Sequence, residues 1–362
     1  MNKFFKLDWM MLGAVALLLI IGMLALYSIS YEDASSIYAG NLARQAISIA
    51  IGGGMLFFLA FFDYRVLNSY STKLYFLGLV LLVLVIVFGK TVNGHTGWLN
   101  FGGVSLQPVE IVKLIMIIFL ASFLSKKKNQ LSIAVRIIVS VVLVFIPIYL
   151  IMKQPDLGSS TIVIGCWGML LFVSGLSKKN LVILIIIGAL LASSGWFFLK
   201  PYQKDRIVNL VRPERDPRGS GYNVLQAIVS VGSGGITGNG LGHGSQSQLN
   251  FLPEKNTDFI FSVLAEELGF IGSLSILILY GILFWRLKET ARMARDNFGY
   301  LIVIGVMAML FLQVLVNVGM NIGVMPVTGV PLPLLSFGGS SVITILASVG
   351  IAESIYMRRI KD

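Results

Sequence analysis

The sequence of 362 residues has few charged residues, two histidines and a single cysteine. Charged residues make up 12% of the chain, whereas a soluble globular domain carries about 25%. Cys166 alone excludes an internal disulfide framework and a multi-cysteine metal site, and His95 and His243 are too few for a histidine-rich cluster. The first apolar run, from Trp9 to about Ser28, is long enough to span a membrane and shows no clear cleavage site, so no cleavable signal peptide is evident.

Apolar residues, in contrast, make up 56% of the chain. No soluble fold of this size could bury so much apolar surface, so the bilayer must be the solvent. The sequence predicts an all-α integral membrane protein, a single polytopic domain over residues 1–362, with about ten transmembrane helices. These are expected at residues 9–29, 43–62, 74–90, 108–124, 134–152, 160–175, 180–199, 258–285, 299–322 and 337–357.

The positive charges indicate the orientation. With the N-terminus inside, 17 of the 28 lysines and arginines fall in cytoplasmic segments, and only three fall at the short outer loops. Seven more lie in a long loop at residues 200–257, where length weakens the charge rule, and Lys113 is intramembrane. This pattern explains the net charge of +11 without nucleic acid. It predicts a multi-pass protein of the cytoplasmic membrane with both termini in the cytoplasm.

The loop at residues 200–257 lies between the seventh and eighth predicted helices and is the main extracellular element. Its first part is charged, and residues 222–231 have apolar residues at helical spacing, which favours a helix on the membrane surface. Seven glycines follow between residues 232 and 244. No βαβ unit surrounds them, so close approach of the backbone to a lipid headgroup or a helix is favoured over nucleotide binding.

Ionisable residues inside a membrane are costly and mark function. Glu110 and Lys113 begin the fourth span, Asp156 lies between the fifth and sixth, and Asp258 opens the eighth. The predicted topology places all four near the outer face. We therefore expect a site at the surface of the outer leaflet.

Each of these residues also has a purely structural interpretation. Glu110 and Lys113 are three residues apart and could simply pair, Asp156 could cap the sixth helix, and Asp258 could stabilise the first turn of the eighth. Two further acids, Glu266 and Glu267, lie about 80° and 180° around that helix from Asp258. At most one of the two can face the same site as Asp258, so a role in a structural network is favoured for Glu266 and Glu267.

Residues 325–333 contain three prolines and cannot form a regular helix. They predict an ordered or re-entrant outer loop. Residues 336–341 then lead into the tenth span.

Four segments carry sequence motifs. Gly97-Trp98 precedes QPVEIVK at residues 107–113, and QPDLG occupies residues 154–158. FLPE, TDFIF and AEELG lie within residues 251–269, and PVTG and PLPLLSFGGSS lie within residues 326–341. Together the motifs resemble the SEDS family of cell-wall proteins, which includes RodA, FtsW and SpoVE, over essentially the whole chain. The similarity to RodA is greatest, and Val109 departs from the family pattern, which has serine there.

The resemblance implies a peptidoglycan glycosyltransferase that polymerises lipid II at the outer face of the membrane, for cell-wall elongation and cell shape. By this similarity, Asp258 matches the essential aspartate. The candidate catalytic residues are Asp258, Lys113 and Glu110, and the candidate substrate-binding residues are Trp98, Asp156, Arg206, Arg212 and Arg215. The expected chemistry is a single inverting displacement with one general base, in which cations neutralise the polyprenyl diphosphate leaving group.

The resemblance also implies a class B penicillin-binding protein as the partner transpeptidase, beside lipid II and membrane lipids. A divalent cation, Mg²⁺ or Mn²⁺, is a candidate cofactor with no ligands assigned, and no organic cofactor is expected. Three alternatives stay open: a lipid II flippase, a structural scaffold, and the division or sporulation paralogue FtsW or SpoVE. A transporter usually places charges near the bilayer midplane, whereas most charges here lie at the outer face.

Overall fold

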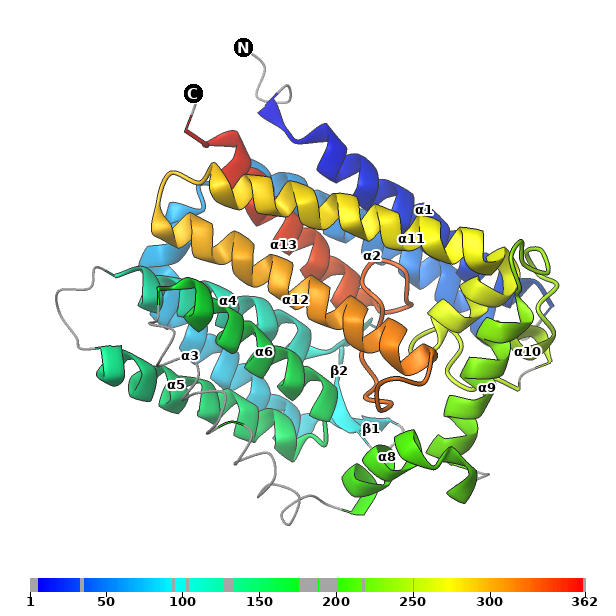
Figure 1. The fold of residues 1–362 in the computed structure, drawn as a ribbon. Coiled ribbons are helices and arrows are strands. Elements are labelled where there is room, and N and C mark those ends of the chain that lie inside the picture. Colours follow the sequence, from blue (N-terminus) through cyan, green and yellow to red (C-terminus); the bar gives the residue numbers. More distant parts are fainter. Residues whose placement is uncertain are drawn as a thin grey trace.

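Long apolar helices make up most of the protein. The structure is a computed structural model that describes residues 6–32, 36–92, 95–101, 104–126, 133–175, 188, 201–216, 219–249 and 251–360. In a bilayer each backbone polar group must find its partner within the protein, so apolar runs become helices. The long apolar helices are α1 (Trp9–Glu32), α2 (Ser36–Phe61), α3 (Arg65–Phe88), α4 (Pro108–Ser125), α5 (Ile133–Lys153), α11 (Ile260–Arg292), α12 (Asn297–Asn321) and α13 (Gly339–Met357). Figure 1 shows them packed side by side in one bundle.

These eight helices of the described residues are long and apolar enough to cross a membrane. The predicted fold class is therefore confirmed: the protein is a multi-pass, mostly helical membrane protein. A ninth helix, α6 (Leu157–Val173), matches the sixth predicted span but has only 17 residues. The seventh predicted span, residues 180–199, lies outside the described residues except for Gly188.

Three helices form the interior of the bundle. In α4 and α13, 83% of the apolar span is buried, and in α12 67%, against 17% in α2 and 22% in α5. Glycine allows the closest approach, because Gly350 of α13 lies against the backbone of Leu56 in α2, where a side-chain carbon would overlap it. Polar residues on α4, α12 and α13 are consequently surrounded by protein instead of lipid.

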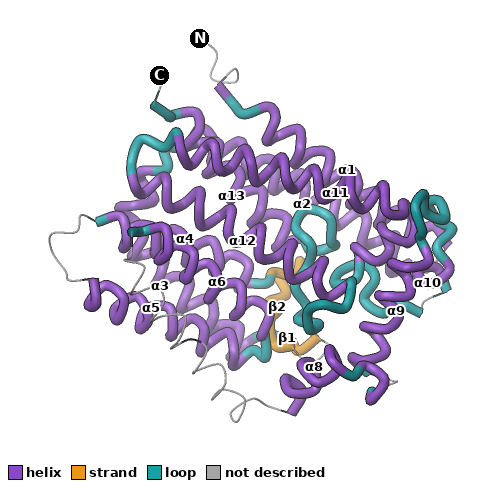
Figure 2. The backbone as a smooth tube through the Cα atoms, viewed as in Figure 1, coloured by secondary structure: helices purple, strands orange, loops and turns teal. Residues whose placement is uncertain are grey.

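A small antiparallel sheet, which the sequence did not predict, connects α3 to α4 (Figure 2). Its strands are β1 (Lys90–Val92), β2 (His95–Phe101) and β3 (Val104–Leu106), in the order β1-β2-β3. The chain then enters α4 through Gln107, whose N–H donates to Ser340 Oγ at the start of α13 at 2.9 Å. This bond ties the first turns of α4 and α13 together.

The predicted long loop contains short helices in its described part. These are α8 (Pro201–Val211), the 3₁₀ turn η3 (Pro213–Arg215), α9 (Ser220–Ser233) and α10 (Ser245–Gln248). The helix expected at residues 222–231 is confirmed as α9, which buries Val224 and Ala227 and leaves Val229 exposed. In Figure 1, α9 lies across the end of the bundle, beside α10.

Helix α11 is broken at Gly269, where the backbone adopts φ 65° and ψ −163°. This positive φ is a conformation that glycine adopts without strain. The glycine-rich segment at residues 234–240 fills the break: Phe270 N–H donates to Gly235 O at 2.9 Å, and Gly240 N–H donates to Glu267 O at 3.0 Å. The loop therefore satisfies backbone groups that the broken helix leaves open.

Glu266 and Glu267 fasten the same loop through their carboxylates. Glu266 accepts backbone hydrogen bonds from Gln246 at 2.8 Å and Ser247 at 3.1 Å. Glu267 accepts from the hydroxyl of Ser28 on α1 and from the loop backbone at 3.2 Å. Both are buried, and both bind the loop in the way that the structural interpretation expected.

The two ends of the bundle differ in what they hold. The terminal end contains the first and last described residues of the chain, and there the N–H of Asp8, just before α1, donates to Glu353 Oε2 near the end of α13 at 3.0 Å. The opposite end, called the site end below, contains residues 254–258, the start of α6 and much of the connection between α12 and α13 at residues 322–338. Having the start of α1 and the end of α13 at one end of the bundle agrees with the prediction that both termini lie on the same side of the membrane.

Candidate active site

Asp258 lies in a turn immediately before α11. The carbonyl oxygen of Glu254 accepts hydrogen bonds from the backbone N–H groups of Thr257 and Asp258, both at 3.1 Å, and from that of Phe259 at 3.4 Å. Helix α11 begins two residues after Asp258, so this side chain stands outside the helix.

The connection between α12 and α13 folds back against this turn. Ser336 Oγ donates to the carbonyl oxygen of Thr257 at 2.6 Å, and the N–H of Phe337 donates to the carbonyl oxygen of Asn256 at 2.8 Å. These two bonds fix the position of the backbone just before Asp258.

The same connection reaches the middle of the helices around it. Tyr280, well inside α11, donates its hydroxyl to the carbonyl oxygen of Pro333. Gly22, near the middle of α1, packs so closely on the backbone of Leu335 that a side-chain carbon would overlap it. The ordered loop predicted from the prolines is therefore confirmed. It folds back into the bundle, supports the Asp258 turn from inside it, and is called the re-entrant loop below.

Asp156 reaches the same place from α6. Its carboxylate accepts a hydrogen bond from the first turn of α6 at 2.8 Å, which confirms the predicted cap. Gly158 of α6 lies directly against the carbonyl oxygen of Thr328 in the re-entrant loop. A Cβ on the next loop residue, Gly329, would lie 3.6 Å from Oδ2 of Asp258. The loop thus brings Asp156 and Asp258 together.

The surroundings of Asp258 disfavour its charged form. Burial raises the pKa of Asp258 to about 7, the charge of Glu254 adds to the rise, the Arg206 guanidinium opposes it, and the charge of Asp156 adds to it again. A carboxylate with this pKa is partly ionised at neutral pH and readily accepts a proton.

Asp258 also differs from the buried acids in its hydrogen bonding. Each buried acid of the described residues accepts at least one hydrogen bond; these acids are Asp8, Glu110, Glu266, Glu267 and Glu353. No group in the described part of the chain donates to the carboxylate of Asp258, and the hydrogen bonds that Asp258 makes there all involve its backbone. Its carboxylate oxygens therefore remain available to a substrate hydroxyl.

Glu110 and Lys113 form a buried ion pair. Lys113 Nζ lies 2.7 Å from Glu110 Oε1, and the two side chains are only 2% and 3% exposed. The pairing that the spacing allowed is therefore confirmed. In this arrangement the ammonium group is turned toward a carboxylate inside the bundle and not toward solvent.

The other candidate substrate-binding residues occupy different positions. Arg206 is half-buried on α8, and its charge reaches Asp258. Arg212 and Arg215 are exposed at η3, and Trp98 is half-buried on β2. The structure thus brings Asp258, Asp156 and Arg206 together and leaves Arg212 and Arg215 on the surface.

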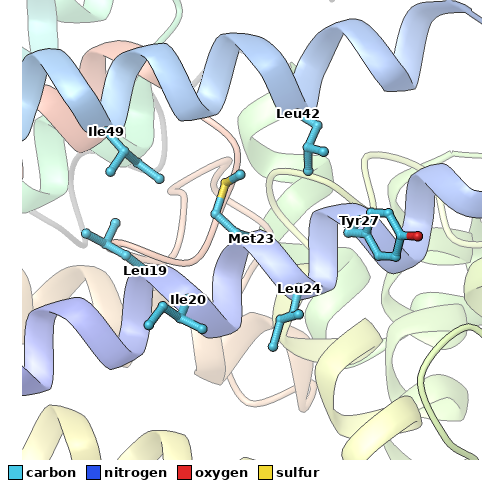
Figure 3. Close-up of a pocket in the computed structure, with 7 residues that line it drawn as sticks. All are labelled: Leu19, Ile20, Met23, Leu24, Tyr27, Leu42 and Ile49. Carbon is cyan, nitrogen blue, oxygen red and sulfur yellow. The ribbon is translucent and has the colours of Figure 1, made fainter.

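An apolar groove of about 330 Å³ lies between α1 and α2 (Figure 3). Its lining has no charged side chain and consists of Leu19, Ile20, Met23, Leu24, Tyr27, Leu42 and Ile49. Ile20, Leu24 and Tyr27 are about half exposed, so the groove opens on the surface that faces lipid. It suits a hydrocarbon chain and not the polar chemistry expected at Asp258.

Comparison with protein families matches residues 8–361 to a family of cell cycle proteins named for FtsW, RodA and SpoVE. The chain belongs to this family. The resemblance drawn from the motifs is confirmed.

Two relatives in the FtsW, RodA and SpoVE family cover nearly all of the chain. The peptidoglycan glycosyltransferase MrdB of Escherichia coli (strain K12) is 40% identical over 98% of this chain and 94% of its own length. Stage V sporulation protein E of Bacillus subtilis (strain 168) is 39% identical over 96% of both.

Solved structures of this family share the fold. A chain from a peptidoglycan synthase complex, described as coordinating polymerisation and crosslinking, matches with a TM-score of 0.84 at 33% identity, over 98% of this chain and 99% of that one. The rod shape determining protein RodA of Thermus thermophilus matches with a TM-score of 0.73 at 29% identity, over 98% of each chain.

Among the described residues, no group of three His, Cys, Asp or Glu side chains is placed to hold a metal ion, so the candidate divalent cation has no protein-built site there.

The sequence did not single out Asn317 and Asn321, whose amides donate to the carbonyl oxygen of Asp258. The available signal was their spacing, since two amides four residues apart share one face of an otherwise apolar helix.

Proposed function

We propose that the protein is a peptidoglycan glycosyltransferase that polymerises lipid II into glycan strands. The names and solved structures of its relatives support this class of enzyme. The observation that carries the assignment to a site is the Asp258 carboxylate, which lies outside α11, accepts no hydrogen bond from the described residues and has a pKa of about 7.

In the proposed reaction Asp258 is the general base. The hydroxyl of the acceptor sugar attacks the anomeric carbon of the donor while the bond from that carbon to the diphosphate oxygen breaks. Asp258 accepts the hydroxyl proton, and the α-linked donor becomes a β-linked glycan with inversion. A single base and no enzyme nucleophile suffice for this displacement.

The leaving diphosphate requires positive charge. Arg206 is the best-placed cation, because its charge already acts on Asp258. Arg212 and Arg215 lie exposed on the same extracellular loop and could meet the diphosphate or the partner. A Mg²⁺ or Mn²⁺ ion would have to take most of its ligands from the diphosphate, because the described residues offer no cluster of three.

The proposed site faces the outside of the cytoplasmic membrane, and both termini face the cytoplasm. Lysine and arginine placement supports this orientation. A cysteine introduced at the exposed Glu214 should react with an impermeant thiol reagent from outside, and one at Ala294 only after the membrane is opened. Labelling of the 214 position from the cytoplasmic side alone would overturn the orientation.

We further propose a class B penicillin-binding protein as the partner. The matched chain from a synthase complex that coordinates polymerisation and crosslinking supports it. The partner should raise the rate of polymerisation by the purified protein.

Polymerisation of lipid II by the purified protein, with and without the partner, tests the proposal directly. Asp258→Asn keeps the shape of the side chain and removes its charge and basicity. We expect the variant to insert and bind its partner, and to lose about 10²–10⁴-fold in rate, which is typical of lost general-base catalysis.

A matched control is Asp8→Asn, the same chemical change at the terminal end. It should lower stability and leave the rate per folded molecule close to that of the wild type. Polymerisation by Asp258→Asn at the wild-type rate would show that Asp258 is not the base. Lipid II translocation without glycan formation would favour the flippase instead.

A further inference from the structure

Asn321, at the end of α12, occupies the place of a helical hydrogen bond. In an α-helix the N–H of a residue donates to the carbonyl oxygen four residues earlier, which for Ser262 would be Asp258. Here Asn321 Nδ2 donates to Asp258 O at 3.1 Å, and Asn321 Oδ1 accepts from Ser262 N at 3.1 Å. The Asn321 amide is inserted between two groups that would otherwise bond to each other.

Asn317, one turn earlier on α12, also donates hydrogen bonds to the Asp258 turn and to the re-entrant loop. Its Nδ2 donates to Asp258 O at 3.0 Å and to Val330 O at 2.8 Å. Val330 follows Gly329, the loop residue that faces the Asp258 carboxylate. Asn317 therefore sets the distance between the Asp258 turn and the re-entrant loop.

The chemistry of the side chain explains why an amide is needed at position 321. An amide supplies a donor and an acceptor together, whereas a carboxylate lacks the donor and an aliphatic side chain lacks both. Ser262 Oγ also donates to the same Asn321 oxygen, at 2.6 Å, so the acceptor is fully used. Asn321 and Asn317 are completely buried, where unpaired polar groups are costly.

We propose that Asn317 and Asn321 are positioning residues that keep Asp258 out of α11 and aim its carboxylate at the space beside Gly329. The proposal rests on the proposed function, because it assigns these amides a role in the same reaction. Without the inserted amide, Ser262 N–H can bond directly to Asp258 O. Helix α11 then begins earlier and turns the Asp258 side chain away.

The test replaces each amide by an aliphatic side chain of similar size, as Asn321→Leu and Asn317→Leu. The matched control is Gln313→Leu, one further turn down α12. Gln313 is also completely buried, and neither of its amide atoms has a hydrogen-bond partner in the described structure. Its loss should leave the reaction unchanged.

The measurements are kcat and KM for lipid II polymerisation with the partner present, thermal unfolding, and the amount of lipid II bound per protein. We expect Asn321→Leu to lose about 10²-fold in kcat, the loss typical of a misplaced reacting group, with KM and bound lipid II within about twofold of the wild type. Asn317→Leu should lose less, because Asn321 still holds Asp258.

Three results would overturn the proposal. One is a wild-type kcat in both variants. Another is a decrease in kcat that is matched by an equal decrease in bound lipid II or in the folded fraction, because such a decrease would reflect a structural defect. The third is an equal loss in Gln313→Leu. If the wild type itself makes no glycan, the proposed function fails and this inference fails with it. If the wild type and Gln313→Leu are active and the asparagine variants match them, the inference alone fails.

Discussion

Asp8 at the terminal end and Asp258 at the site end use their carboxylates in opposite ways. At the terminal end, Asp8 accepts a hydrogen bond from Met11 N–H at 3.2 Å, pairs with Arg286 of α11 at 2.7 Å and donates its own N–H to Glu353 of α13. At the site end, the Asp258 carboxylate accepts no bond from any described residue. The Asp8 carboxylate joins helices, whereas that of Asp258 is held by its backbone and left open.

The difference shows which interactions fix the backbone in each region. Arg286 also reaches the hydroxyl of Tyr356 at 3.3 Å, so the charges of the terminal end hold α1, α11 and α13 in one arrangement. Around the Asp258 turn, the neutral amides of α12 and the hydroxyl of Ser336 provide the support instead. Neutral supports leave the charged group of the site free for substrate.

The Glu110–Lys113 pair is the strongest challenge to this comparison, because it is a paired charge at the site end. Lys113→Met leaves Glu110 buried without a partner, and we expect a loss of about 3–5 kcal/mol in the free energy of unfolding. The double variant Glu110→Gln with Lys113→Met should recover most of this stability and of the polymerisation rate. Thermal unfolding in detergent and the rate per folded molecule are the measurements.

The outcome decides to which class the pair belongs. Recovery of both quantities places it with the structural charges of the terminal end. A double variant that is stable but makes no glycan would show instead that Lys113 acts in catalysis, as its place among the candidate catalytic residues implies.

The pH dependence of the polymerisation rate tests the role of Asp258 through a smaller effect. A general base works only when ionised, so the rate should fall as pH drops through the Asp258 pKa of about 7. Arg206→Gln removes a charge that lowers this pKa and should move the acid limb to higher pH. Glu254→Gln removes a charge that raises it and should move the limb to lower pH.

The measurement is the pH profile of kcat/KM, which reports the pKa of the free enzyme. At neutral pH the two variants should differ from the wild type by less than about tenfold from this cause, since tenfold corresponds to a full pKa unit. The position of the limb is decisive, because Arg206 also contributes to substrate binding in the proposal. Limbs that move in the same direction would rule out Asp258 as the titrating group.

The helices could be predicted from the sequence because the apolar runs are long, although their ends could not. The third span was expected from residue 74, yet α3 begins at Arg65, since a helix continues past the hydrocarbon with polar residues such as Asn68 and Ser71. The sheet at residues 90–106 was missed, because its strands are short and carry no alternating pattern. Short strands of this kind depend on their packing against neighbouring elements more than on the intrinsic preferences of their residues.

The site was predictable in its charged residues and not in its neutral ones. Asp258 and Asp156 stand out in an apolar chain, and the loop does bring them together. Asn317 and Asn321 do not stand out in the same way. Their role becomes clear only when α12 is placed against the start of α11, where both amides donate to the carbonyl oxygen of Asp258. The break at Gly269 was hidden as well, since AEELG reads as continuous helix until the glycine-rich segment is placed inside it.

The re-entrant loop has a consequence for how the protein is made. Its contacts come from segments inserted early and late in synthesis: Gln45 of α2 holds Ser336 O at 3.2 Å and Gly338 N at 3.1 Å. Asn317 of α12 holds Val330 O. A growing chain that has released α11 and α12 still lacks the segment that supports Asp258. The contacts that fix the turn before Asp258 can therefore form only after the loop at residues 322–338 has been synthesised.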